Sequence, residues 1–195
     1  MNKTIEVEVK IPVASLNQVH DALTELGARE TKSEYQVDDY YDHPCRQFSL
    51  TDEALRLRTR IHGKVSDESL DPSYPRSELT YKGKKIDRLS KTRLELSTGI
   101  SDSDAFKSIL IELGFNYVAS IKKNRKYFAL DGFTVSIDEV EELGVYAELE
   151  LVVFSEDQIQ PTRETIFELA RKMGLDPAES TRKSYLELLL ERRTS

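Results

Sequence analysis

The chain has 195 residues and a formal net charge of −7, from 28 Lys and Arg against 35 Asp and Glu. This length, with a hydrophobic fraction of 38%, is enough for one folded domain with a buried core, which argues against disorder. No run approaches the roughly 18 apolar residues of a membrane span, and the first residues lack the apolar segment of a secretory signal. We therefore expect a cytoplasmic protein, and its acidic balance disfavours binding to a nucleic acid duplex.

Cysteine and histidine contribute little to this sequence. A single cysteine, Cys45, excludes an internal disulfide, and the three histidines have no spacing typical of a zinc site. Cys45 lies beside His43 only in sequence, so we interpret it as a loop cysteine and not as a nucleophile. Any bound metal ion is therefore expected to have mainly carboxylate ligands.

Three regions have the apolar spacing of amphipathic helices. The first follows Pro12 and ends at Gly27, the second runs from Ser101 to Gly114, and the third begins after Pro161, pauses at Gly174 and resumes near Thr181. The polar segment from Ser66 to Tyr74 is predicted to be a flexible loop. Because no repeat and no linker interrupts the chain, we predict one domain over residues 1–195.

Most of the remaining chain alternates apolar and charged residues with the period of two that is typical of β-strands. Acids gather near the two ends of the strand series and bases fill its middle, whereas an ordinary solvated face would mix in Ser, Thr, Gln and Asn. The acids are Glu6, Glu8, Asp138, Glu148 and Glu150, and the bases are Arg56, Arg58, Lys82, Arg93, Lys123 and Arg125. This separation of charge indicates a functional face.

A closed antiparallel sheet with helices on its apolar outside would place these charges in its lumen, where they have to be paired or hydrated. If the sheet closes in this way, its first and last strands lie side by side. Carboxylate oxygens suit Mg²⁺ or Mn²⁺, and facing Arg and Lys side chains suit phosphate oxygens, so a triphosphate fits such a lumen. No glycine-rich phosphate loop offers an alternative site.

The order of these residues resembles the CYTH family, the triphosphate tunnel metalloenzymes. Glu6-Val7-Glu8-Val9-Lys10 is similar to the ExExK signature of that family, and the stretch from Gln36 to Arg58 most resembles class IV adenylyl cyclases. One departure is Lys84-Lys85 after Gly83, where many members have proline. The other matching motifs are Arg56-Leu57-Arg58, Thr80-Tyr81-Lys82-Gly83, Arg93-Leu94-Glu95, Lys123-Asn124-Arg125, Asp138, Glu148-Leu149-Glu150 and Ser184-Tyr185.

The resemblance implies an α+β fold with a closed eight-stranded antiparallel β-barrel and helices packed outside. This barrel is a tunnel that binds ATP or another triphosphate and requires Mg²⁺ or Mn²⁺. The implied metal ligands are Glu6, Glu8, Asp138, Glu148 and Glu150. The implied triphosphate ligands are Lys10, Arg56, Arg58, Lys82, Arg93, Lys123 and Arg125, of which Lys10, Arg56, Lys82 and Arg125 would act in catalysis.

Three functions are compatible with such a site. The first is an adenylyl cyclase that converts ATP to 3′,5′-cyclic AMP and pyrophosphate and needs no dedicated protein base. The second is a triphosphatase acting on inorganic, thiamine or nucleoside triphosphate, with water as the nucleophile. The third is a noncatalytic module that binds polyphosphate or nucleotide, which would need the bases but not five convergent acids. The cyclase is the first hypothesis; a homodimer is left open.

Other polar residues near these motifs are expected to be structural. Arg60, at the far end of its strand, is expected to be solvated. For Glu95 two roles are open, an ion pair with a base or a functional acid. Tyr40 and Tyr41 are expected to pack, and Tyr185 to lie in the core.

Overall fold

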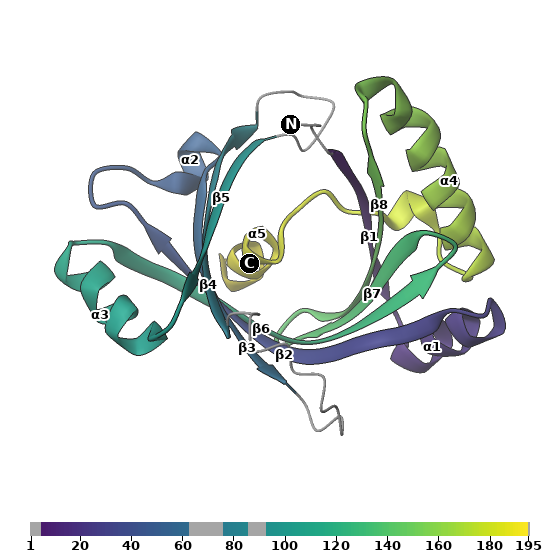
Figure 1. The fold of residues 1–195 in the computed structure, drawn as a ribbon, viewed down its shortest axis with the longest axis horizontal. Helices are drawn as coiled ribbons and strands as arrows, with labels where there is room; N and C mark the ends of the chain where they lie inside the picture. Colours follow the sequence, from purple (N-terminus) through teal and green to yellow (C-terminus); the bar gives the residue numbers. More distant parts are fainter. Residues whose placement is uncertain (1–4, 63–75, 86–92, 195) are drawn as a thin grey trace. The chain divides into compact units, whose positions relative to one another are not determined.

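The computed structural model describes residues 5–62, 76–85 and 93–194 (Figure 1). The predicted loop from Ser66 to Tyr74 lies outside the described residues. The strands are β1 (Ile5–Val13), β2 (Arg29–Asp42), β3 (Ala54–His62), β4 (Ser77–Lys85), β5 (Arg93–Ile100), β6 (Asn116–Leu130), β7 (Phe133–Val140) and β8 (Gly144–Val153). The helices are α1 (Leu16–Glu25), α2 (Phe48–Thr51), α3 (Ser103–Glu112), α4 (Ile159–Lys172) and α5 (Tyr185–Thr194), with 3-10 turns η1 (Glu156–Gln158) and η2 (Pro177–Glu179).

The strands form one eight-stranded sheet in the order β1-β8-β7-β6-β2-β3-β4-β5, with antiparallel ladders. The first and last strands pair, as expected, through nine residue pairs from Ile5 and Val153 to Val13 and Val145. This pairing does not come from closure, because β1 and β5 each have one hydrogen-bonded neighbour in that order. For the described residues the predicted closed barrel is wrong, and the sheet is open.

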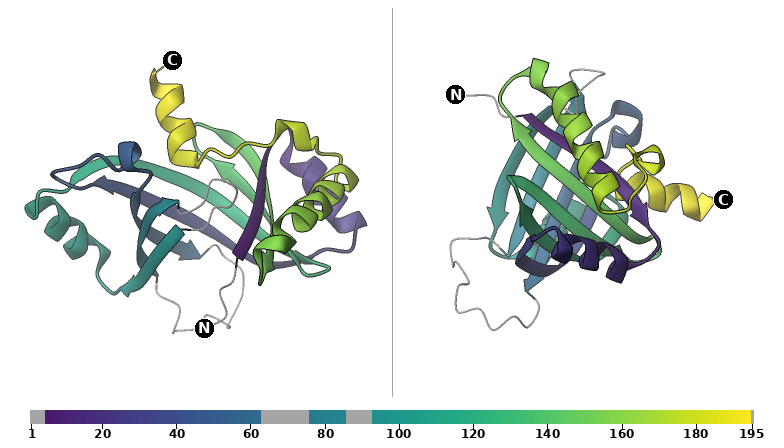
Figure 2. Two further views of the ribbon diagram at one scale, coloured as in Figure 1. Left: turned by 90° about the horizontal axis from the view of Figure 1, so that it is seen from above. Right: turned by 90° about the vertical axis from the view of Figure 1, so that its right-hand side faces the viewer.

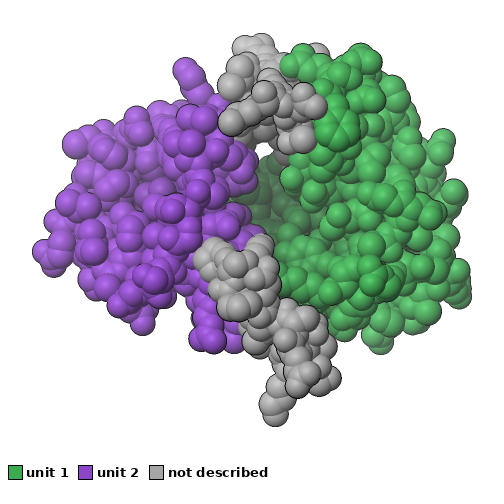
Figure 3. All heavy atoms as spheres, viewed as in Figure 1, with its two compact units in different colours: residues 1–33, 123–195 green, residues 34–122 purple. Residues whose placement is uncertain are grey.

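The chain divides into two compact units, shown in different colours in Figure 3. Unit 1 comprises residues 1–33 and 123–195, and unit 2 comprises residues 34–122. Each unit has its own hydrophobic core.

The core of unit 1 lies between the apolar faces of β1, β7 and β8 and the helices α1 and α4. Val9 and Leu149 from the sheet pack with Leu23 of α1 and Ile166 of α4. Figure 2 shows α4 lying along this part of the sheet. The alternation in the sequence is thereby confirmed, because the apolar side chains of these strands lie under helices and the charged ones lie on the other face. Gly27, with φ of +79°, ends α1 in a conformation that favours glycine.

The core of unit 2 is smaller. Leu57 of β3, Phe48 of α2 and Leu110 of α3 are buried together in it. The Asp102 side chain caps the N-terminus of α3 by accepting a hydrogen bond from the backbone N–H of Ala105 at 2.9 Å. No helix among the described residues is both long enough and apolar enough to span a membrane.

Candidate functional site

The ladders of unit 1 bring the predicted acids and three predicted bases onto adjacent strands. Glu8 of β1 lies opposite Glu150 of β8, and Lys10 lies opposite Glu148. On the next strands, Arg125 of β6 lies opposite Asp138 of β7. Antiparallel pairing therefore joins residues that are more than a hundred positions apart in the sequence into one polar face.

Asp138 is the most enclosed of these acids, with 0% of its surface exposed. Its carboxylate accepts hydrogen bonds from Lys123 Nζ at 3.1 Å, from Arg125 Nε at 2.5 Å and again from Arg125 Nη2, and from the Tyr185 hydroxyl at 2.8 Å. Burial alone would raise the pKa of Asp138, but Lys123 and Arg125 outweigh it and hold that pKa below its usual value. The carboxylate is therefore ionised, and four donors from the described residues surround it.

Glu148 is the second acid that is neutralised by bases. Its carboxylate lies 3.3 Å from Lys10 Nζ and accepts a hydrogen bond from Arg125 Nη2. Burial favours the protonated form, but Arg125, Lys123 and Lys10 hold the pKa of Glu148 well below its usual range. The two carboxylates in turn raise the pKa of the buried Arg125 guanidinium, against the effect of its own burial. Arg125 thus bridges Asp138 and Glu148.

Glu150 has the opposite electrostatic environment. Burial, followed by the neighbouring carboxylates of Glu6, Glu8 and Glu148, raises its pKa from 4.5 to about 7. Glu6 is exposed and Glu8 partly buried, so this group of acids opens to solvent at one end. A cation would relieve the repulsion among these carboxylates.

The donor set therefore fits a hard divalent cation in its chemistry, since all the ligands would be oxygens. In the described part of the chain, however, no three His, Cys, Asp or Glu side chains are already arranged to hold a metal ion. Metal binding at Glu6, Glu8, Glu148 and Glu150 thus requires their side chains to converge.

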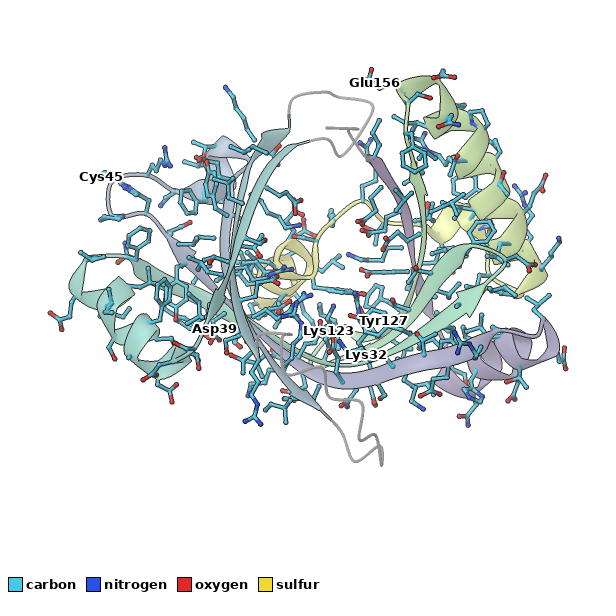
Figure 4. The ribbon with its side chains drawn as sticks, viewed as in Figure 1. Lys32, Asp39, Cys45, Lys123, Tyr127 and Glu156 are labelled. Atoms are coloured by element: carbon cyan, nitrogen blue, oxygen red, sulfur yellow. The ribbon has the colours of Figure 1, made fainter. Side chains whose placement is uncertain are left out.

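Lys123 and Lys10 complete the basic side of the face in unit 1. Lys123, labelled in Figure 4, is buried on β6, and its ammonium lies beside Asp138. Lys10 is also buried, with 6% of its surface exposed. The segment before α5 covers it, because Lys10 Nζ donates to the carbonyl of Lys183 at 3.2 Å and the N–H of Thr181 donates to the Lys10 carbonyl at 2.8 Å.

In unit 2, Arg58 of β3 forms a two-pronged ion pair with Asp38 of β2. Its Nε and Nη2 each lie 2.6 Å from a carboxylate oxygen, and both side chains are largely buried. Arg60 extends this pattern by pairing with Glu34 at 3.9 Å and with Glu78 at 3.5 Å. The expectation that Arg60 is solvated is wrong: the strand continues past it under neighbouring acids, and only 6% of its surface is exposed.

Arg56 of β3 has neutral partners instead. Its Nη2 donates to Thr80 Oγ1 at 3.5 Å, and its guanidinium donates a hydrogen bond to the phenol oxygen of Tyr40. Burial, followed by the charge of Asp38, raises the pKa of Tyr40. Its buried Nε has no hydrogen-bond partner among the residues that the structure describes. Among the predicted phosphate ligands of unit 2 whose side chains the structure describes, Arg56 is therefore the one with the least compensated charge.

The remaining predicted residues of unit 2 lie at its more exposed strands. Lys82 of β4 pairs with Glu95 of β5 at 2.9 Å, which agrees with the first of the two roles open for Glu95, an ion pair with a base. The side chain of Arg93 lies outside the described part of the structure. Cys45 is exposed in the loop between β2 and α2, in agreement with its interpretation as a loop cysteine (Figure 4).

Sequence reasoning missed two polar roles. Tyr185 is buried, as expected, but its hydroxyl also bonds to Asp138. Asp38 lies within the stretch from Gln36 to Arg58 that carries the resemblance, and the structure shows that it neutralises Arg58. The alternation of side chains gives the face of a residue and not its partner, so neither contact could be deduced from spacing.

Comparisons of the sequence with known proteins find relatives that cover most of this chain. A protein of Methanocaldococcus jannaschii that is provisionally named an adenylate cyclase is 36% identical over 184 residues, which is 94% of this chain and 98% of that protein. The adenylate cyclase CyaB of Aeromonas hydrophila is 27% identical over 94% of this chain and 87% of its own length.

Solved structures give the same fold. A protein of Pyrococcus horikoshii matches with a TM-score of 0.79 and 38% identity over 96% of this chain and 99% of its own. An adenylyl cyclase-like protein of Hippeastrum matches with a TM-score of 0.62 and 16% identity over 97% of this chain and 96% of its own. The family model of the CYTH domain matches residues 4–185, and because this range is nearly the whole chain, the protein belongs to the CYTH family.

Proposed function

We propose that this protein is a metal-dependent adenylyl cyclase that converts ATP to 3′,5′-cyclic AMP and pyrophosphate. The observation that supports this proposal most is the polar face of unit 1. There, four glutamates suited to a divalent ion lie on strands next to the buried Lys10 and Lys123 and the largely buried Arg125. The adenylate cyclase names of two relatives support the choice of reaction.

We propose Glu6, Glu8, Glu148 and Glu150 as the ligands of Mg²⁺ or Mn²⁺. Once bound, such an ion would lower the pKa of the ribose 3′-hydroxyl and offset phosphate charge. The sequence prediction also included Asp138 among the ligands. Its four hydrogen bonds favour a different role, which is to hold Lys123 and Arg125 in place.

The basic residues are proposed to bind the triphosphate. Lys10, Lys123 and Arg125 in unit 1 would donate to phosphate oxygens and stabilise the charge that develops on the leaving pyrophosphate. In unit 2, we propose the same two roles for Arg56 and Lys82. Arg58 and Arg93 are proposed to bind phosphate oxygens only. The 3′-hydroxyl is the nucleophile, and because a bound metal ion would lower its pKa, its proton could pass to water without a dedicated protein base.

A triphosphatase that uses the same residues is the second candidate. The Hippeastrum protein is named for a dominant triphosphatase activity, although its 16% identity supports only a shared fold. In that reaction water attacks the terminal phosphorus, so the ribose plays no part.

One incubation separates the two reactions. The protein is mixed with ATP and Mg²⁺ or Mn²⁺, and the products are separated into cyclic AMP, ADP and AMP. A cyclase gives cyclic AMP and pyrophosphate, whereas ADP or AMP without cyclic AMP contradicts the proposal. The variant with both Glu148→Gln and Glu150→Gln serves as the control, because it should lose turnover and so exclude a contaminating activity.

A further inference from the structure

Tyr185 is the aromatic residue that joins the C-terminal segment to the charged face of unit 1. It is the first residue of α5, and 7% of its surface is exposed. Its hydroxyl donates to Asp138 Oδ2 at 2.8 Å, which is the carboxylate oxygen that also accepts from Lys123 Nζ at 3.1 Å. One end of the side chain therefore takes part in the network that surrounds Asp138.

The ring of Tyr185 contacts the two buried ammonium groups of the same face. Lys10 Nζ lies 4.0 Å from the ring centroid and Lys123 Nζ lies 4.9 Å from it. Both distances are within the range of a favourable cation–π interaction, which strengthens when the cation is removed from water. Both lysines are nearly fully buried, at 6% and 2% exposure.

This arrangement addresses a specific problem. Two buried ammonium groups near one another repel, and each loses hydration. Asp138 and Glu148 supply the opposite charge, and the electron-rich ring lies against both cations without adding a negative charge that would repel a phosphate. The backbone bonds of Thr181 and Lys183 to Lys10 hold the preceding segment against the same strand.

We propose that Tyr185 is a positioning residue of the triphosphate site, which holds Lys10 and Lys123 in place through its ring and Asp138 through its hydroxyl. The proposal rests on the proposed binding of a triphosphate by these lysines. It assigns a role in ligand binding to a residue of the last helix, which helical spacing alone identifies as core.

Two substitutions divide the contributions of Tyr185. Tyr185→Phe keeps the ring and removes the hydrogen bond to Asp138, whereas Tyr185→Leu removes both. Leu189→Ala is the matched control, because Leu189 is buried one turn later in α5, at 1% exposure, and no polar contact of its side chain is possible. This control shows how a less stable α5 alone changes the affinity for triphosphate.

The assay is the affinity for inorganic triphosphate, measured by calorimetry in the presence of a chelator, together with the free energy of unfolding in urea. We expect affinity to fall about threefold in Tyr185→Phe and about tenfold or more in Tyr185→Leu, as for a lost hydrogen bond and a lost cation–π contact. In Leu189→Ala we expect a loss of stability with affinity within about twofold of the wild type, because this truncation removes no polar group and keeps the ring and the hydroxyl of Tyr185.

Each outcome decides the question. The positioning role is supported if the affinity for triphosphate falls in Tyr185→Phe and falls further in Tyr185→Leu, while Leu189→Ala binds nearly as tightly as the wild type. Wild-type affinity in both Tyr185 variants, or an equal loss in Leu189→Ala, overturns it while the proposed function stands. If the wild type itself binds no triphosphate, with or without Mg²⁺, the proposed function fails and this inference fails with it.

Discussion

Replacing Glu150 by Gln is expected to stabilise the protein at and above neutral pH. Burial and the carboxylates of Glu6, Glu8 and Glu148 raise the pKa of Glu150 in the folded state, so its ionised form is disfavoured there. Gln has nearly the same shape and no charge. The substitution therefore removes a repulsive charge from the acidic group without leaving a cavity.

The pH window follows from the raised pKa. Between pH 4.5 and about 7, the folded protein retains a proton that the unfolded chain has lost, so the free energy of unfolding of the wild type falls as pH rises. Below this window the carboxyl group of Glu150 is protonated in both states and does not affect stability. Above the window it is ionised in both states, and the free energy of unfolding is lowered by the full cost of burying the charged form. The shift corresponds to about 3 kcal/mol at 1.36 kcal/mol per pKa unit, and the partial exposure of Glu150 reduces our expectation to about 1–2 kcal/mol.

Urea unfolding in a chelator at pH 4, 6 and 8.5 measures this effect. We expect Glu150→Gln to match the wild type at pH 4 and to exceed it by the stated amount at pH 8.5. Glu148→Gln is the control, for which we expect the opposite effect. Arg125, Lys123 and Lys10 lower the pKa of Glu148, so the substitution breaks buried ion pairs and should lower the free energy of unfolding by about 3 kcal/mol. A Glu150→Gln variant no more stable than the wild type at pH 8.5 would refute the electrostatic reasoning.

Three further predictions concern activity. Turnover is expected to be absent in excess chelator and restored by Mg²⁺ or Mn²⁺, because the proposed ligands are all oxygens; full turnover in chelator would exclude the metal site. Lys82→Ala and Arg125→Ala should each weaken triphosphate binding by about 1.5–3 kcal/mol, the range for a hydrogen bond to a charged group, and unchanged affinity in both would reject their phosphate role. Finally, 3′-deoxy-ATP should bind without giving a cyclic product, and inorganic triphosphate should compete without rapid hydrolysis; a triphosphatase would hydrolyse both.

The alternation of the strands could be predicted where one face is apolar. In β1 and β8, Val9 and Leu149 lie in the core while Glu8 and Glu150 lie on the opposite face, as the period of two requires. In β2 the pattern is hidden, because Asp38 is itself buried and paired with a base of β3. A strand whose inward side chains are charged has no apolar stripe to detect, so β2 was recognised only as part of a resemblance.

The order of the strands could be predicted only in part. The pairing of the first and last strands was deduced from closure of a barrel, and the pairing is confirmed while the closure is wrong. Hydrogen bonding between strands is set by backbone groups that every residue has, so side-chain patterns indicate that a strand exists more reliably than they identify its neighbours. The helices were easier, because their apolar stripes and terminal glycines are local signals.

Arg56 and Arg58 of unit 2 differ in how far their charge is already balanced by neighbouring side chains, and this difference bears on the proposed binding of phosphate. Arg58 is held by both oxygens of Asp38, so a phosphate there has to share the guanidinium with a carboxylate 2.6 Å away. Arg56 has only neutral partners at its described contacts, and its Nε is buried without one. A buried guanidinium N–H without an acceptor lowers the stability of the protein, and a phosphate that accepts from Arg56 would remove this penalty. At Arg58 a phosphate would instead replace a carboxylate, so the gain in binding free energy is only the difference between these two acceptors. The same physical argument therefore favours Arg56 as the residue of unit 2 that contributes most to phosphate affinity, and Arg58 as one that mainly shapes the face on which Arg56 lies.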